Sequence, residues 1–200
     1  MTLMHQGGFM MWPLLIVSVA ALAVIAERFM TFTTTRFPNE QAVQKAFTLA
    51  RSGNISEAVD AICESTQLYR PFFYALFEKT DPQTREQHIT QVGEETLFTL
   101  SRRLDFLATV SAAAPLMGLL GTVLGMINAF SRLASSGSVD IAMLSGGIWQ
   151  ALLTTAAGLS IAIPSLLAHR WFCRMHAKTA FSLQKTAVAY LTPSTQPDAE

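Results

Sequence analysis

The order of apolar and polar positions along the chain divides it into three long uncharged stretches and the polar segments between them. Residues 1–26, 106–131 and 141–169 contain no Asp, Glu, Lys or Arg. Each stretch is longer than the roughly 18 uncharged, mainly apolar residues that indicate a membrane span. We therefore expect transmembrane helices at 9–26, 106–131 and 141–169, and the pattern excludes a water-soluble enzyme as the leading interpretation.

Basic residues beside these spans predict their orientation. They follow span one, precede span two and follow span three, at Arg28, Arg102, Arg103 and Arg170. Basic residues next to a span tend to remain in the cytoplasm. The expected order is an outer N-terminus at 1–8, an inner region at 27–105, an outer loop at 132–140 and an inner tail at 170–200.

The inner region has the spacing of amphipathic helices. Apolar residues recur every three or four positions through 42–50, Asn54 or Ser56 is placed to cap a second helix ending near Ile62, and Pro71 suits the first turn of a third. No proline or paired glycine lies between Thr84 and Pro115, so we expect one helix to run from Thr84 directly into span two. We also expect a long helical extension after span three and a frayed tail at 192–200.

Spans two and three differ from span one, which is bulky and suits contact with lipid. They carry small residues that let helix backbones in a membrane approach closely, and the candidates for helix packing are Pro115, Gly118, Gly121, Gly125, Gly158 and Pro164. A three-helix chain has little interior in which to bury two such faces. We therefore expect further copies of the chain or other subunits.

Thr122 and Thr155 are the candidate pore-lining residues, with Thr154 and Gln150 on a neighbouring stripe. At 100° per residue Thr122 shares one stripe with Pro115 and Gly118. Counted from the outer ends of their spans, Thr122 and Thr155 lie at similar depths, so their hydroxyls could meet near the bilayer midplane. Helix packing is the ordinary alternative, because threonine often bonds only its own backbone carbonyl.

Composition excludes several kinds of function. Fourteen Lys and Arg balance 14 Asp and Glu, so no broad positive surface attracts nucleic acid. Cys63 and Cys173 lie in different segments and form no disulfide framework or paired metal motif, which predicts reduced cytoplasmic thiols. Ionisable residues normally mark proton pathways through membranes, and the three spans contain no Asp, Glu, Lys or Arg. If this chain works with protons, another chain must bring the carboxylate.

Three motifs in the spans resemble a known family. They are MMWP at 10–13 with ERF at 27–29, APLMGLLGTVLGM at 114–126, and GIWQALLTTAAGLSIAIP at 147–164. With the long inner segment, they are similar to the MotA/TolQ/ExbB proton-channel family, and most similar to its ExbB branch. The flagellar stator branch is less similar because it has four spans.

This resemblance implies an all-α integral membrane protein that forms a homo-pentameric ring in a Gram-negative inner membrane, with a periplasmic N-terminus. The ring would enclose transmembrane helices of ExbD-type subunits, which supply a protonatable Asp, and would bind TonB. The complex would use the proton-motive force to drive uptake of siderophore-bound iron or cobalamin, without a cofactor or enzymatic activity. Thr122 and Thr155 match the family's pore-lining threonines.

The sequence departs from the family at one position. Many ExbB proteins carry a Glu where this chain has Gln150, which can form hydrogen bonds but cannot titrate. We expect Gln150 to keep a polar contact while proton transfer uses only the partner's Asp.

Other interpretations remain open at this point. A TolQ role in the Tol system is the nearest alternative, and a passive scaffold is another. An intramembrane serine protease with Ser160 as nucleophile lacks a histidine base at similar depth, since His169 lies at the inner boundary. Ala21-Leu22-Ala23 matches a signal-peptidase site, but residues 1–8 lack the basic residues of a signal peptide.

Two groups of polar residues border the spans on the inner side. Boundary or partner-contact roles are expected for Glu27, Arg28, Arg102, Arg103 and Asp105. His169, Cys173 and His176 share one helix face, but three ligands fall short of the usual four for a structural zinc site. We therefore expect no metal there.

Overall fold

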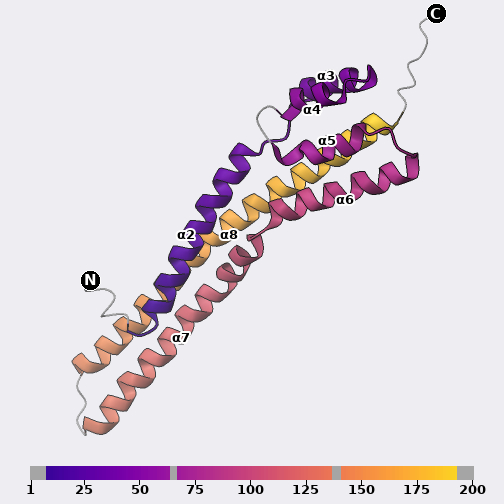
Figure 1. Cartoon of the computed structure of the whole chain (residues 1–200). Helices are drawn as coiled ribbons and strands as arrows, with labels where there is room; N and C mark the ends of the chain where they lie inside the picture. The colour runs from indigo at the N-terminus through magenta and orange to yellow at the C-terminus, as the bar shows by residue number, and fades with distance from the viewer. Residues whose placement is uncertain (1–7, 64–66, 137–140, 193–200) are drawn as a thin grey trace, which may run out of the picture. The chain divides into compact units, whose positions relative to one another are not determined.

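The computed structural model describes residues 8–63, 67–136 and 141–192, and every regular element among them is a helix (Figure 1). The helices are α2 (Met11–Thr34), α3 (Glu40–Arg51), α4 (Ile55–Cys63), the 3₁₀ turn η1 (Gln67–Tyr69), α5 (Arg70–Phe77), α6 (Pro82–Ser101), α7 (Leu104–Ser136) and α8 (Ile141–Leu191). The all-α prediction is confirmed. The predictions for the N-terminus at 1–8 and the tail at 192–200 lie largely outside the described residues. Of the expected loop at 132–140, residues 137–140 lie outside them, and residues 132–136 continue α7 as helix.

The chain forms two compact units. The first contains residues 8–28 with 103–136 and 141–171, and the second contains residues 29–63, 67–102 and 172–192. Helices α2 and α8 each contribute residues to both units.

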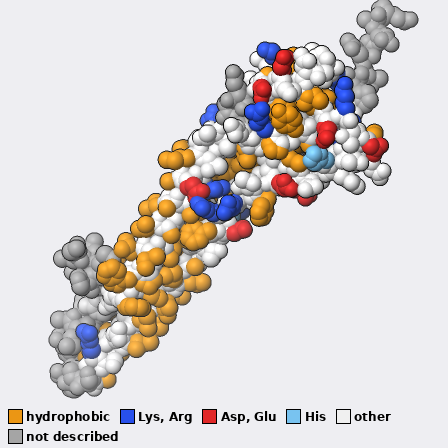
Figure 2. All heavy atoms as spheres, in the orientation of Figure 1, with side chains coloured by type: hydrophobic (Ala, Val, Ile, Leu, Met, Phe, Trp, Pro, Cys, Tyr) orange, Lys and Arg blue, Asp and Glu red, His pale blue; other side chains and the backbone are white. Residues whose placement is uncertain are grey.

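The first unit holds apolar helices whose side chains remain mostly exposed. Three helical stretches are long and apolar enough to cross a membrane, at Met11–Thr34, within Pro82–Ala134 and within Leu144–Leu191. Large apolar side chains such as Ile16, Leu116 and Leu152 are exposed on them, and hydrophobic atoms dominate the visible face of α7 (Figure 2). Side chains of this kind face lipid in a membrane protein. The prediction of three membrane-spanning helices is confirmed.

The second unit has a conventional hydrophobic core rich in aromatic rings. Helices α3 and α4 bury the periodic apolar residues that predicted them, among them Val43, Phe47 and Val59. Asn54 directly precedes α4, and Pro71 lies in the first turn of α5. Tyr69 and the α5 phenylalanines fill the centre of this core and share it with Leu183 of α8. The part of α8 that follows span three therefore supplies one side of the core.

The expected continuous helix from Thr84 into span two is wrong. Helix α6 begins at Pro82 and ends at Ser101, and α7 begins at Leu104. Between them Arg102 is extended (ψ 133°) and Arg103 has a left-handed backbone (φ 66°). A side chain with a Cβ reaches this region only at a cost of roughly 1–2 kcal/mol, so contacts made by the link must hold it there.

Candidate functional site

Helices α7 and α8 are two long helices labelled in Figure 1. Within the first unit they pack against each other along a face made of small residues. The facing pairs are Ala129 with Gly147, Gly125 with Ala151, Gly121 with Thr154, and Ala114 with Gly158. From each facing pair to the next, the residue number decreases on α7 and increases on α8, so the two helices are antiparallel. The contact extends over about four turns of α7 and about three turns of α8, which gives the pair a fixed register.

Three glycines in this contact leave no space for a side chain. A Cβ added to Gly158 would lie 2.5 Å from the carbonyl oxygen of Ala114, and one added to Gly118 would lie 2.9 Å from that of Thr154. A Cβ on Gly121 would lie 2.7 Å from the Thr154 side chain. Since real Cβ atoms do not approach this closely, any side chain would push the helices apart.

Thr154 is enclosed by the same contact. Its side chain is 1% exposed, and its hydroxyl donates a hydrogen bond to the carbonyl oxygen of Ala151 at 2.8 Å. The structure therefore groups Thr154 with the packing glycines, whereas the sequence pattern predicted a place on the stripe next to the pore-lining residues.

Thr122 and Thr155 lie at the edge of the contact and are both half-buried. The Thr122 hydroxyl donates to the Leu119 carbonyl oxygen in its own helix at 2.7 Å. The Thr155 hydroxyl points across to the carbonyl oxygen of Gly118 at 3.5 Å, one helical turn from Thr122. The two hydroxyls donate to backbone rather than to each other, so each oxygen keeps lone pairs that can accept a proton donor.

The other predicted residues of spans two and three lie apart from this edge. Pro115 is half-buried within α7 and Pro164 is exposed on α8. The amide of Gln150 contacts the backbone just before α2, since a Cβ on Gly8 would lie 1.9 Å from its Nε2. The Gln150 side chain therefore lies beside the backbone at the start of span one.

Charged residues of α2 meet the link that precedes α7. Arg28 donates from Nη2 to Glu27 Oε1 at 2.9 Å, and Arg103 donates to the other oxygen of the same carboxylate. Arg28 is only 6% exposed, and within the described part of the chain its Nε and Nη1 have no hydrogen-bond partner. Glu27 thus joins span one to the left-handed link before span two, while Arg102 and Asp105 are exposed.

One packing residue was not among the predicted sites. Gly147 faces Ala129 so closely that a Cβ would lie 2.3 Å from the Ala129 Cβ. Its position seven residues before Thr154 and eleven before Gly158 is the available signal, because this spacing repeats on one helix face.

The competing sites gain no support from geometry. Ser160 donates to the Ala156 carbonyl oxygen at 2.8 Å, and His169 lies nine residues further along the same helix, about 13 Å away at 1.5 Å per residue. That distance is too long for a base to take the Ser160 proton. Among the residues that the structure describes, no three His, Cys, Asp or Glu side chains lie close enough to hold a metal ion.

Comparison with known proteins adds an independent line of evidence. Residues 64–185 match the model of the MotA/TolQ/ExbB proton channel family. The chain is 30% identical over 192 residues to biopolymer transport protein exbB1 of Vibrio cholerae, covering 90% of this chain and 84% of the relative. It is 31% identical over 173 residues to the putative biopolymer transport protein ExbB-like 1 of Synechocystis sp., covering 82% of this chain and 67% of the relative. A segment of 79 residues is 43% identical to biopolymer transport protein ExbB of Neisseria gonorrhoeae, covering 38% and 36% of the two chains.

Proposed function

The chain belongs to the MotA/TolQ/ExbB proton channel family, and we propose that it is the channel-forming subunit of an ExbB-type complex that couples the proton-motive force to TonB. Its partners in this proposal are further copies of itself in a pentameric ring, ExbD-type subunits and TonB. The work done is active transport across the outer membrane, with siderophore-bound iron or cobalamin as the cargo. The ExbB names of its relatives favour the TonB system over the Tol system.

One observation carries this proposal. The tight α7–α8 contact buries Thr154 but leaves Thr122 and Thr155 half-buried at its edge, in spans that contain no Asp, Glu, Lys or Arg. A hydroxyl can accept a hydrogen bond from a protonated carboxylic acid and can donate one to a carboxylate. Such an edge suits a carboxyl group that a second protein brings into the ring, because it can contact that group in either protonation state.

The proposed orientation follows from the basic flanks. Arg28 and Arg103 lie at the end of span one and the start of span two that we assign to the cytoplasm, and Arg170 follows span three. In this arrangement, in the bacterial inner membrane, the second unit lies in the cytoplasm and the connection between α7 and α8 lies in the periplasm.

Replacing the edge hydroxyls tests the proposal. Thr122→Val and Thr155→Val keep the side-chain shape but remove the hydrogen bond to the partner's carboxyl. A hydrogen bond to a charged group contributes roughly 1.5–3 kcal/mol, so TonB-dependent uptake is expected to fall about tenfold or more. Ser160→Ala is the matched control, since this exposed hydroxyl lies elsewhere on α8 and bonds only its own helix. Normal uptake with both valine variants, at unchanged assembly, would contradict the proposed role.

Gln150 provides a second test of where the proton is carried. If only the partner's Asp titrates, the protein with Gln150 is active, and Gln150→Glu leaves uptake about the same. Uptake that appears only with Glu at this position would mean that this chain must itself carry the proton.

A further inference from the structure

The second unit carries two exposed stripes of opposite charge. The acidic stripe follows α6 and consists of Gln87, Gln91, Glu94, Glu95 and Phe98, all of them exposed. The basic stripe follows the last part of α8 and consists of Arg174, Lys178, Phe181, Lys185 and Val188, also all exposed. Members of each stripe are spaced so that they share one helix face. Each stripe therefore combines charge of one sign with a large exposed ring.

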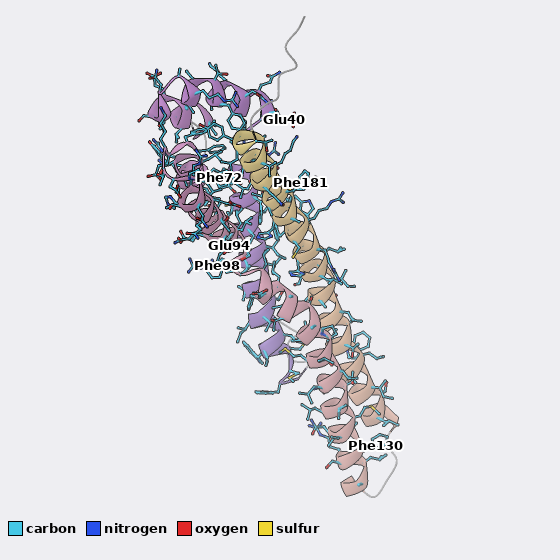
Figure 3. The ribbon with its side chains drawn as sticks, turned by 90° about the vertical axis from the view of Figure 1, so that its right-hand side faces the viewer. Glu40, Phe72, Glu94, Phe98, Phe130 and Phe181 are labelled. Carbon is cyan, nitrogen blue, oxygen red and sulfur yellow. The ribbon has the colours of Figure 1, made fainter. Side chains whose placement is uncertain are left out.

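The aromatic residues are unusually accessible for their size. Phe98 is 75% exposed and Phe181 is 68% exposed, although the same unit buries seven other aromatic side chains to 6% exposure or less. Glu94 and Phe98 lie on one side of the unit and Phe181 lies on the opposite side (Figure 3). Because they face opposite directions, the two stripes cannot satisfy each other within one copy of the chain.

The kind of symmetry decides how two copies can meet through these stripes. In a two-fold dimer the same patch meets itself, which would bring the carboxylates of Glu94 and Glu95 together. In a head-to-tail ring the patch on one side of a copy meets the opposite side of the next. Only the second arrangement brings carboxylates to ammonium and guanidinium groups.

The two stripes are also matched in height. His176 of α8 bonds the carbonyl oxygen of Leu97 of α6 at 3.1 Å, which fixes these two residues at one level along antiparallel helices. Counting from this contact, Glu94 and Glu95 are level with Lys178, and Phe98 is level with the interval between Arg174 and Lys178. Rotation about an axis parallel to the helices preserves these levels from one copy to the next.

We propose that the acidic stripe of α6 docks on the basic stripe of α8 of the neighbouring copy, with Glu94 and Glu95 facing Lys178 and Phe98 packing between Arg174 and Lys178. A ring face beside a cation is a favourable contact, and the long basic side chains cover the ring with their apolar stems. This interface rests on the proposed function, because it requires that the chain form a ring of identical copies. Beyond the ring itself, the proposal identifies residues outside the membrane through which neighbouring copies bind each other.

Cysteine cross-linking in the membrane-embedded complex tests the interface. In a background with Cys63→Ser and Cys173→Ser, the pair Glu95→Cys and Lys178→Cys is combined in one chain and oxidised. A disulfide forms only between residues whose Cα atoms are about 4.4–6.8 Å apart. The proposed interface sets position 95 of one copy opposite position 178 of the next, so we expect oxidation to link successive copies into a ladder of oligomers. Glu86→Cys with Lys178→Cys is the matched control, because Glu86 lies on α6 outside the stripe, and we expect about tenfold less product from it.

Charge reversal separates the possible results. We expect Glu94→Lys with Glu95→Lys to weaken the oligomer in native mass spectrometry, and the addition of Lys178→Glu to restore it. An intact oligomer without the Glu95–Lys178 cross-link would overturn this interface and leave the proposed function standing. A chain that forms no homo-oligomer with its partner subunits would overturn both. If Lys178→Glu changed only binding to vesicles of anionic phospholipid, the basic stripe would be a lipid contact and the interface would be wrong.

Discussion

At the scale of single residues, Tyr69 makes the stability of the second unit sensitive to alkali. Its side chain is completely buried, and its hydroxyl donates to the carbonyl oxygen of Thr35 at 2.9 Å. Burial raises the pKa of the Tyr69 phenol, and a hydrogen bond with Thr179 opposes this shift only in part. The folded unit therefore holds the neutral phenol to a higher pH than the unfolded chain does.

The expected consequence is a loss of stability at high pH. An unfolded tyrosine ionises near pH 10, so this stabilisation is complete below that pH and is lost as the pH rises through the higher folded pKa. Tyr69→Phe should cost about 1 kcal/mol near neutral pH through the lost hydrogen bond, and should make thermal unfolding less dependent on pH above 10. Tyr74→Phe is the control, because Tyr74 is 40% exposed. Equal alkaline sensitivity in the wild type and Tyr69→Phe would show that another group is responsible.

Adjacent threonines mark the limit of what the sequence predicts at this scale. Thr154 and Thr155 have the same chemistry, and helical geometry places them 100° apart. Which of them packs against Gly121 depends on how α7 and α8 rotate about their own axes when they meet. That rotation is determined by tertiary contacts such as Gly158 against Ala114, which no local pattern records.

At the scale of elements, the α7–α8 pair depends on backbone contact at Gly158. A Cβ there would lie 2.5 Å from the Ala114 carbonyl oxygen, an atom that cannot turn aside as a flexible side chain can. Gly158→Ala should therefore destabilise the pair by roughly 1–3 kcal/mol, the usual cost of overpacking. The loss is measurable as a lower unfolding midpoint in detergent.

Two other glycines of the chain are suitable controls for that variant. Among the described residues, no atom outside the adjoining backbone lies within 4 Å of a Cβ added to Gly146, and Gly125 has only ordinary contacts at 3.5 Å. Gly146→Ala should be neutral or slightly stabilising, because alanine is the better helix former. If Gly146→Ala and Gly158→Ala behaved alike, helix propensity rather than close packing would explain the effect.

The link between α6 and α7 is a second element-scale feature with a measurable consequence. Arg103 has φ 66° and donates to the carboxylate of Glu27. Arg103→Ala and Arg103→Gly both remove this ion pair, but only alanine keeps the unfavourable left-handed Cβ. The glycine variant should therefore be more stable than the alanine variant by about 1 kcal/mol in thermal unfolding. The opposite order would mean that the link is an ordinary helix in solution.

The helix boundaries show why some elements follow from the sequence and this link does not. Asn54 and Pro71 begin helices through their own backbone and side-chain preferences, and α4 and α5 begin where those residues predict. Residues 101–105 contain neither proline nor glycine, so nothing local ends a helix there. The break at Arg103 coincides with its contact to Glu27, which lies 76 positions earlier in the chain.

At the scale of the whole molecule, the spans could be predicted because the membrane imposes a minimum length on uncharged helices. Lipid cannot hydrogen-bond a free backbone group, so the pattern alone identifies helices in α2, α7 and α8. The partners could not be derived in this way. The small-residue faces indicate that something packs against them, and only the resemblance of the motifs and the family relationship indicate what it is.

The topology itself can be tested with single cysteines in a chain that carries Cys63→Ser and Cys173→Ser. Ala134 lies near the end of α7 that we assign to the periplasm, and Gln87 lies on α6, which we assign to the cytoplasm; both positions are exposed. A membrane-impermeant maleimide added to spheroplasts should label Ala134→Cys and should label Gln87→Cys only after lysis. Basic residues that remain inside during insertion are the physical reason for this order. Labelling of Gln87→Cys in intact spheroplasts, with Ala134→Cys protected, would show that the orientation is the reverse of the one proposed. The charged stripes of α6 and α8 would then lie in the periplasm instead of the cytoplasm.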